Sequence, residues 1–121
     1  SISTDGSPTM RHPRSFGSFP KVIEEYVVRD NVLSIELAIN KMTGQTAKIF
    51  GLQSRGLLKE GLAADILVMD INNIKANTTW TNIFATPSGF DYVIVNGHLT
   101  DTTAKSSQPT FGRILLKHKG D

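Results

Sequence analysis

The stretch FDYVIVNGHLTD, residues 90–101, carries the strongest structural signal in the chain. A mostly apolar run, Phe90–Val95, is followed by the pair Asn96-Gly97 and by a second short run, His98–Asp101. Asn-Gly favours a type I′ turn, because both central residues of that turn need a positive φ. The pattern therefore predicts a β-hairpin.

Further strands are predicted on either side of this hairpin. Leu62–Asp70 is an apolar run bounded by breaker residues, which is typical of a buried strand. Near the end of the chain, Arg113–Lys117 predicts a last short strand. The polar stretches at residues 72–89 and 102–112 predict loops, and aromatic residues such as Trp80 are expected to anchor the first of them.

The first half of the chain changes to a helical period. Pro20 suits the first turn of a helix, where a missing N–H costs little, and Ser18 or Phe19 precedes it as a cap. This helix is predicted to end near Asp30, and it carries an apolar stripe at the spacing i, i+4, i+7 and i+8. The residues of this stripe are Phe19, Ile23, Tyr26 and Val27.

Two more short helices are predicted after it. The second starts at Ser34 and stops at Gly44. The third, Thr46–Phe50, ends at Gly51. Helices followed by three or four strands are typical of an α+β chain. The apolar stripe of the second helix consists of Ile35, Ala38, Ile39 and Met42.

Composition limits the classes of function. The chain has 121 residues, which is one domain at most or a piece of one, and it has no cysteine. A disulfide framework, a thiolate zinc site and a cysteine nucleophile are thereby excluded. The formal net charge of +2 argues against nucleic acid or an anionic membrane as the main partner. No apolar run approaches the ~18 residues of a membrane-spanning helix, and the N-terminus lacks the apolar core of a signal peptide, so a cytoplasmic location is expected.

Residues 1–20 are rich in glycine, proline and serine, and they predict a loop that carries the candidate chemical groups. Asp5, His12 and Arg14 place a carboxylate, an imidazole and a guanidinium on this one segment. An aspartate can accept a proton from a metal-bound water while it touches the metal, and an arginine can bind a carboxylate through two parallel hydrogen bonds. From these residues alone, a polar tail without a site remains the favoured interpretation.

The three histidines give no metal signal of their own. His12, His98 and His118 are far apart in the sequence and match no metal-ligand spacing. Each is therefore interpreted first as a surface histidine.

Four motifs follow one another along the chain. STDG at residues 3–6 is followed by HPRSFGSFP at residues 12–20, and GLAAD at residues 61–65 by VIVNG at residues 93–97. The last two are shared widely among amidohydrolases, whereas the first two are much narrower. In these motifs the whole chain resembles the C-terminal part of the D-aminoacylase, or N-acyl-D-amino-acid deacylase, family of the amidohydrolase superfamily.

This resemblance implies a division of the chain. Residues 1–52 would be the end of a metal-dependent (β/α)8 barrel, with an active-site loop at residues 1–20 and the last barrel helices after it. Residues 53–121 would be strands of the small amidohydrolase β domain. Asp5 would then follow the eighth barrel strand, at the face of the barrel where active sites of this fold lie.

The resemblance also implies roles for individual residues. Asp5 would be a metal ligand and the general base, which takes a proton from a zinc-activated water and passes it to the leaving amine. Arg14 would hold the carboxylate of the N-acyl-D-amino acid, and His12 is a weaker candidate for substrate binding. The family's remaining zinc ligands are absent from this chain, so the chain alone is expected to have neither deacylase activity nor a tight zinc site. Asp65 is expected to be structural.

Two other functions stay open at this point. One is a cyclic-amide hydrolase of the dihydroorotase or hydantoinase kind, although the HPRSFGSFP motif argues against it. The other is a non-catalytic α+β module that retains only the tail of such an enzyme. In either case the apolar helix stripes need a partner surface, which makes self-association of the chain an expectation.

Overall fold

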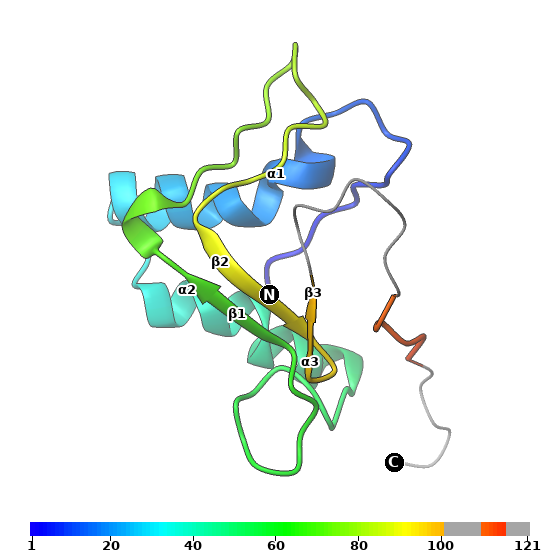
Figure 1. Ribbon diagram of the computed structural model, residues 1–121. Helices are drawn as coiled ribbons and strands as arrows, with labels where there is room; N and C mark the ends of the chain where they lie inside the picture. The colour runs from blue at the N-terminus through cyan, green and yellow to red at the C-terminus, as the bar shows by residue number, and fades with distance from the viewer. Residues whose placement is uncertain (101–109, 116–121) are drawn as a thin grey trace.

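A computed structural model of the chain describes residues 1–100 and 110–115 (Figure 1). Its four longer helical segments come before the strands along the chain, as the sequence predicts, and only a short 3₁₀ turn lies between two described strands. The helical segments are α1 Arg14–Lys21, η1 Val22–Arg29, α2 Ile35–Met42, α3 Gly44–Phe50 and the short η2 Ile71–Asn73. The strands are β1 Ile66–Met69, β2 Phe90–Val95 and β3 His98–Thr100.

The hairpin of β2 and β3 is confirmed. The two strands pair antiparallel, with Val95 opposite His98. Asn96 has φ 49° and Gly97 has φ 81°, which is the left-handed backbone that a type I′ turn requires. Strand β3 was predicted to reach residue 101, which lies outside the described residues.

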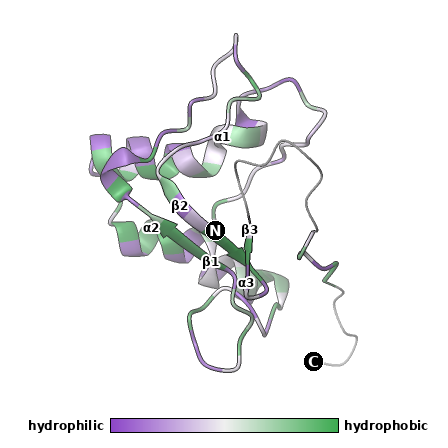
Figure 2. Cartoon of the chain, viewed as in Figure 1, coloured by the Kyte–Doolittle hydropathy of each residue, from purple (hydrophilic) through white to green (hydrophobic). Residues whose placement is uncertain are grey.

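The predicted strand Leu62–Asp70 is shorter in the structure and is not buried. Strand β1 covers Ile66–Met69 and pairs antiparallel with β2, so the sheet order is β1-β2-β3 and β1 lies at an edge. Figure 2 shows that β1 is hydrophobic along its length, yet Leu67 and Val68 are exposed. A continuous apolar run predicts a strand covered on both faces, whereas the described part of the chain leaves these side chains open to solvent.

The last predicted strand, Arg113–Lys117, is wrong in its described part. Residues 110–115 have no regular secondary structure, and Ile114 is 90% exposed. Residues 116 and 117 lie outside the described residues. The described segment is held by single contacts instead of a strand ladder: the Phe111 carbonyl accepts a hydrogen bond from the Asn96 side chain, and the Phe111 ring stacks on His98.

The first helix begins five or six residues earlier than predicted and follows a different apolar face. It starts at Arg14 after Pro13, so Pro20 is inside the helix and is buried. Pro20 has no N–H to donate, and from Val22 onward the helix takes the wider π pattern, which accommodates such a break. Of the predicted stripe, Ile23 is buried and Val27 half-buried, but Phe19 and Tyr26 are exposed.

The second and third helices agree more closely with the sequence. Ser34 caps α2, because its hydroxyl accepts a hydrogen bond from the Leu37 N–H at 3.2 Å, and the predicted stripe of α2 is buried or half-buried. Gly44 was predicted to stop this helix, but α2 ends at Met42 and Gly44 begins α3. Gly51 ends α3 in the left-handed conformation, with φ 70°.

The core of the described chain is small and lies where the helices meet the segment after β1. Helix η1 contacts both α2 and η2. The largest fully buried side chain is Ile74, which comes directly after η2. The buried hydrophobic residues are Ile23, Ala38, Ala47, Ile74 and Ala76. No helix in the described residues is long and apolar enough to cross a bilayer, and the cytoplasmic location stays a prediction.

Candidate functional site

Asp5 and Arg14 form a two-bond ion pair at the start of α1. The Arg14 Nε lies 2.9 Å from Asp5 Oδ1, and Arg14 Nη2 donates to Asp5 Oδ2 at 3.1 Å. Both side chains reach solvent, with 41% of Arg14 and 76% of Asp5 exposed. Two parallel hydrogen bonds between a guanidinium and a carboxylate are directional, so the pair sets the relative orientation of the two groups while it is closed.

The two motifs of the opening segment pack against each other to form this pair. A Cβ on Gly6 would lie 2.5 Å from the Cα of Ser15, so only glycine permits the STDG backbone to approach α1 so closely. Thr4 adds two hydrogen bonds: its hydroxyl accepts from the Gly6 N–H at 3.1 Å and donates to the Arg14 carbonyl at 3.3 Å. Asp5 is thereby held opposite the first residue of the helix.

His12 also contacts the first turn of helix α1. Its Nδ1 accepts a hydrogen bond from the Arg14 backbone N–H at 3.1 Å, which satisfies one of the free donors at the helix start. The ring of His12 also meets the ring of Trp80 edge to face, with centroids 4.7 Å apart. His12 therefore contacts Arg14 through the backbone and does not pair with Asp5.

A groove of about 450 Å³ runs along the helix beside His12 and Arg14. Helix α1, the first turn of η1 and residues 75–80 form its walls. Its charged lining is mixed, because Lys21 pairs with Glu25 at 3.5 Å and Lys75 pairs with Glu24 at 3.2 Å. Arg14 lines this groove, whereas its partner Asp5 is not among the lining residues.

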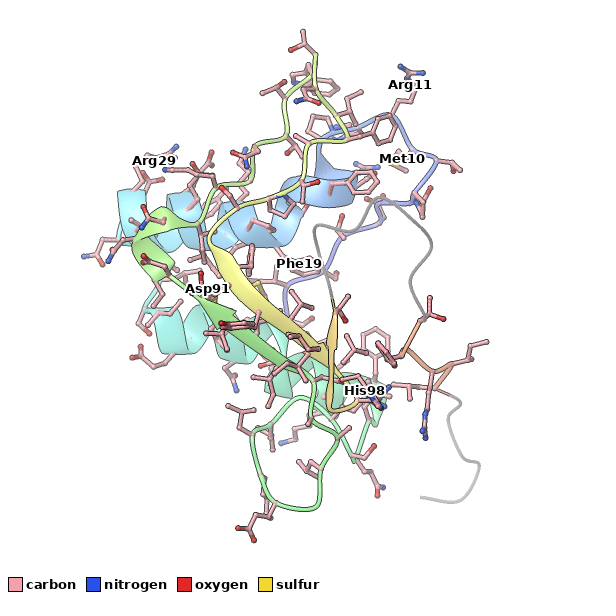
Figure 3. The ribbon with its side chains drawn as sticks, in the orientation of Figure 1. Met10, Arg11, Phe19, Arg29, Asp91 and His98 are labelled. Carbon is pink, nitrogen blue, oxygen red and sulfur yellow. The ribbon has the colours of Figure 1, made fainter. Side chains whose placement is uncertain are left out.

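The described residues do not hold a metal by themselves. No group of three or more His, Cys, Asp or Glu side chains is arranged for a metal within residues 1–100 and 110–115. Asp5 offers carboxylate oxygens, a suitable zinc donor, but the Nδ1 of His12 already accepts a hydrogen bond. Figure 3 shows His98 near the hairpin, at the other end of the molecule from Met10 in the opening segment, and His118 lies outside the described residues.

A second Arg–Asp pair joins the motifs of the second half. Arg55 pairs with Asp65, and both hold Asn96: the Asn96 N–H donates to Asp65 Oδ1 at 2.8 Å, and Arg55 Nη2 donates to Asn96 Oδ1 at 2.6 Å. The Asn96 N–H and the Arg55 guanidinium hold the pKa of the Asp65 carboxyl below its usual range, although partial burial opposes them. These bonds fasten the segment before β1 to the hairpin turn, and we call them the Asn96 clasp.

Sequence reasoning missed two of these contributors. Arg55 had no predicted role, and its pairing with Asp65 across ten residues follows no helical or strand spacing. Trp80 was expected to anchor a loop, but its contact with His12 spans the two halves of the chain. A lone tryptophan in a polar loop was the available signal, and it does not identify its partner.

Comparison with known proteins agrees with the motifs. A sequence model of the amidohydrolase family matches residues 1–100. The chain is 37% identical over 118 residues to N-acyl-D-glutamate deacylase and 38% identical over 118 residues to D-aminoacylase, both from Alcaligenes xylosoxydans xylosoxydans. Each match covers 96% of this chain and 24% of the relative, so the chain spans about a quarter of the length of these relatives. A dihydroorotase from Endomicrobium trichonymphae matches over 58% of the chain, with 37% identity over 82 residues and 19% of the relative covered.

Solved structures give the same relationship. The crystal structure of D-aminoacylase superposes with a TM-score of 0.71 at 36% identity, covering 73% of this chain and 19% of that one. N-acyl-D-glutamate deacylase from Bordetella bronchiseptica, solved with zinc and a phosphonate inhibitor, gives 0.73 at 34% identity, covering 76% and 19%. The chain therefore belongs to the amidohydrolase family, and its resemblance to D-aminoacylase and the N-acyl-D-amino-acid deacylases extends over nearly its whole length.

Proposed function

We propose that this chain is part of a zinc-dependent amidohydrolase that hydrolyses the amide bond of N-acyl-D-amino acids. The contact between Asp5 and Arg14 carries the proposal, since it places a potential base beside a group suited to bind a carboxylate. The similarity to N-acyl-D-glutamate deacylase and D-aminoacylase over 96% of the chain supports this reaction and this class of substrate.

Within such an enzyme, residues 1–52 are the end of a (β/α)8 barrel and residues 53–121 belong to the small β domain. Two observations support this division: α1 to α3 fall in the first range and β1 to β3 in the second. Asp5 then stands at the carboxyl-terminal face of the barrel, where the active sites of this fold are built.

Arg14 binds the carboxylate of the substrate in this proposal. Its guanidinium already holds one carboxylate, that of Asp5, through two bonds of 2.9 and 3.1 Å. The same planar fork fits the α-carboxylate of an amino acid, and 41% of the side chain is exposed to receive it. His12 has the smaller role of holding the Arg14 N–H at the first turn of the helix.

Asp5 is the general base and one metal ligand. Zinc, when bound, would lower the pKa of a water that it coordinates. Asp5 accepts a proton as the water oxygen bonds to the amide carbonyl carbon, and it returns this proton to the nitrogen as the C–N bond breaks. The products are a carboxylic acid and a free D-amino acid, and the other metal ligands come from outside the described residues.

Both roles require the Asp5–Arg14 pair to open. A substrate carboxylate that takes the Arg14 fork displaces Asp5, whose 76% exposed side chain has little packing to hold it in place. Exposed ion pairs are worth about 1 kcal/mol or less, so a bound substrate can meet this cost. The chain alone is expected to be inactive, because its described residues offer one of the proposed ligands and not a complete zinc site.

Two other functions can be distinguished from the deacylase by experiment: a cyclic-amide hydrolase and a non-catalytic module. The partial match to dihydroorotase favours a cyclic-amide hydrolase as the second candidate. A panel of one cyclic amide, such as dihydroorotate, and one N-acetyl-D-amino acid separates the two reactions. If a complete protein that contains this chain hydrolyses neither substrate, the non-catalytic module is the better description.

The central experiment is the Asp5→Asn substitution in a complete enzyme that contains this chain. The amide keeps the shape of the side chain but cannot act as a base, so kcat for an N-acetyl-D-amino acid should fall by about 10²- to 10⁴-fold. Asp91→Asn is the matched control, since Asp91 is an exposed aspartate on strand β2 (Figure 3) and should leave kcat unchanged. Near-normal turnover in Asp5→Asn with its metal content intact would remove Asp5 from the mechanism.

A further inference from the structure

The loop of residues 75–84, here called the Trp80 loop, reaches the candidate site from the second half of the chain. Figure 1 shows this loop, in green to yellow-green, rising beside α1 and the dark-blue opening segment. At its base, the Ala76 N–H donates to the Glu24 carboxylate at 2.8 Å and Lys75 pairs with the same carboxylate at 3.2 Å. The loop is thus fastened to η1 before it reaches the site.

A second contact brings the loop directly onto α1. Gly17 is buried, and a Cβ built on it would lie 2.0 Å from the Thr78 hydroxyl oxygen. Glycine at this position therefore lets Thr78 rest against the helix backbone, one turn after Arg14. Glycine in a helix interior costs about 1 kcal/mol relative to alanine, so this close approach offers a structural reason for its presence.

Trp80 stands at the tip of a compact turn beyond this contact. The Thr79 N–H donates to the Asn82 carbonyl at 3.1 Å, and the Asn82 N–H donates to the Thr79 hydroxyl at 2.9 Å. Trp80 is 71% exposed, so it contributes little to the core of the described chain. Its ring nevertheless meets His12 edge to face at 4.7 Å.

This contact restrains the side chain that holds the start of α1. For Nδ1 of His12 to accept the Arg14 N–H, the ring must keep its orientation and a neutral ring must carry its proton on Nε2. Rotation of the ring would break that hydrogen bond. Trp80 packs against the ring and opposes the rotation, while the guanidinium of Arg14 is bound to Asp5.

We propose that Trp80 is a positioning residue for the candidate site: it holds the His12 ring, and through it the first turn of α1 from which Arg14 meets Asp5. The positioning itself is a property of this chain, whereas its effect on turnover rests on the proposed deacylase function. Trp80 acts on Arg14 and Asp5 through His12 in this scheme.

The test within the chain is nuclear magnetic resonance of the Trp80→Leu variant. The ring nitrogens of His12 should lose their single neutral tautomer, and the backbone N–H of Arg14 should exchange with solvent about 2- to 10-fold faster, as loss of an aromatic pair implies. Trp80→Phe keeps an aromatic edge and should restore much of both signals. Phe84→Leu is the matched control: Phe84 is an aromatic residue of the same loop that packs on Phe16, and its loss should leave the His12 tautomer unchanged.

The second arm uses a complete enzyme that contains this chain. Trp80→Leu should lower kcat/KM for an N-acetyl-D-amino acid about 10-fold, mainly through a higher KM, because Arg14 binds the substrate carboxylate. Trp80→Phe should recover most of the loss. An unchanged His12 tautomer and unchanged Arg14 exchange in Trp80→Leu would overturn the positioning role. If instead these signals change but no form of the enzyme hydrolyses the substrate, the positioning holds and the proposed function fails.

Discussion

The molecule contains two Arg–Asp pairs with similar sequence separations and very different surroundings. Arg14 and Asp5 are nine residues apart, and Arg55 and Asp65 are ten apart. The side chains of the first pair are 41% and 76% exposed, whereas those of the second are 16% and 37% exposed. In the described part of the chain, Arg14 is the hydrogen-bond partner of the Asp5 carboxylate, while Asp65 is shared between Arg55 and the Asn96 N–H.

The residue types of an ion pair therefore do not decide its role. The Asn96 clasp is cross-linked, so removing one member leaves a half-buried charge without its partner. The Asp5–Arg14 pair is open to solvent, so it can separate at little cost and offer each group to another molecule. The first arrangement is suited to stability and the second to chemistry.

The largest expected difference between the pairs is in stability. Asp65→Ala should lower the free energy of unfolding by roughly 2 to 3 kcal/mol, because it leaves the half-buried Arg55 guanidinium without its carboxylate partner. Asp5→Ala should lower it by about 1 kcal/mol at most. Urea unfolding of both variants, followed by circular dichroism, measures the two values. Equal losses would contradict the distinction between the pairs.

The second difference is in substrate binding. Arg14→Lys should reduce kcat/KM of a complete enzyme about 10-fold while the fold stays intact, because an ammonium cannot reproduce the two-bond fork. Arg11→Lys makes the same change at a neighbouring exposed arginine (Figure 3) and should have no effect. If Arg14→Lys loses stability and keeps its kcat/KM, then Arg14 is a structural residue like Arg55. The proposed difference between the two pairs would then be wrong.

A smaller effect is expected where the Trp80 loop packs against helix α1, next to the Asp5–Arg14 pair. Gly17→Ala places a methyl group against Thr78 and should push the Trp80 loop away from α1, at a net cost of about 1 kcal/mol after the gain in helix propensity. Gly112→Ala is the control, since a Cβ there would meet nothing within 4 Å. Thermal unfolding gives the cost, and the tryptophan emission of Trp80 should shift only in the first variant. If Gly17→Ala instead stabilises the chain, the Trp80 loop can move away from α1 without a measurable cost in stability.

The smallest expected effect is the pH dependence of the Asn96 clasp. The pKa of Asp65 lies below its usual range because the Asn96 N–H donates to the carboxylate and Arg55 pairs with it. The unfolded chain therefore binds this proton at a higher pH than the folded chain, and acid favours unfolding. The free energy of unfolding should fall as the pH drops below about 4, and less so in Asp65→Asn. Because a hydrogen bond is the main cause, the difference should persist in about 0.5 M salt, and its loss there would indicate a screened charge effect.

Local sequence accounts for several elements of the fold. The Asn96-Gly97 turn, the Ser34 cap and the Gly51 stop all lie where the sequence predicts them. Each depends on backbone preferences or hydrogen bonds within a few residues, so neighbouring residues suffice to specify it. The order of helices before strands follows from the same local periods.

Packing over longer distances decided the remaining features of the fold. The first helix continues through Pro20, and both Gly17 and Pro20 are buried, which the sequence pattern does not reveal. Strand β1 is an edge strand because its other side meets no strand in the described chain. An apolar run indicates that a strand is hydrophobic, but it does not indicate how many neighbouring strands or helices cover that strand.

In the candidate site, too, the sequence determined some features and the tertiary structure decided others. The motifs placed Asp5, His12 and Arg14 on one segment, and their roles in catalysis and binding stay predictions. The tertiary structure decided that Asp5 meets Arg14, because Gly6 packs on Ser15. It also decided that Trp80 meets His12 and that Arg55 meets Asp65, contacts between side chains that are remote in the sequence or follow no helical or strand period. Such contacts depend on how the elements pack, which local preferences along the chain leave open.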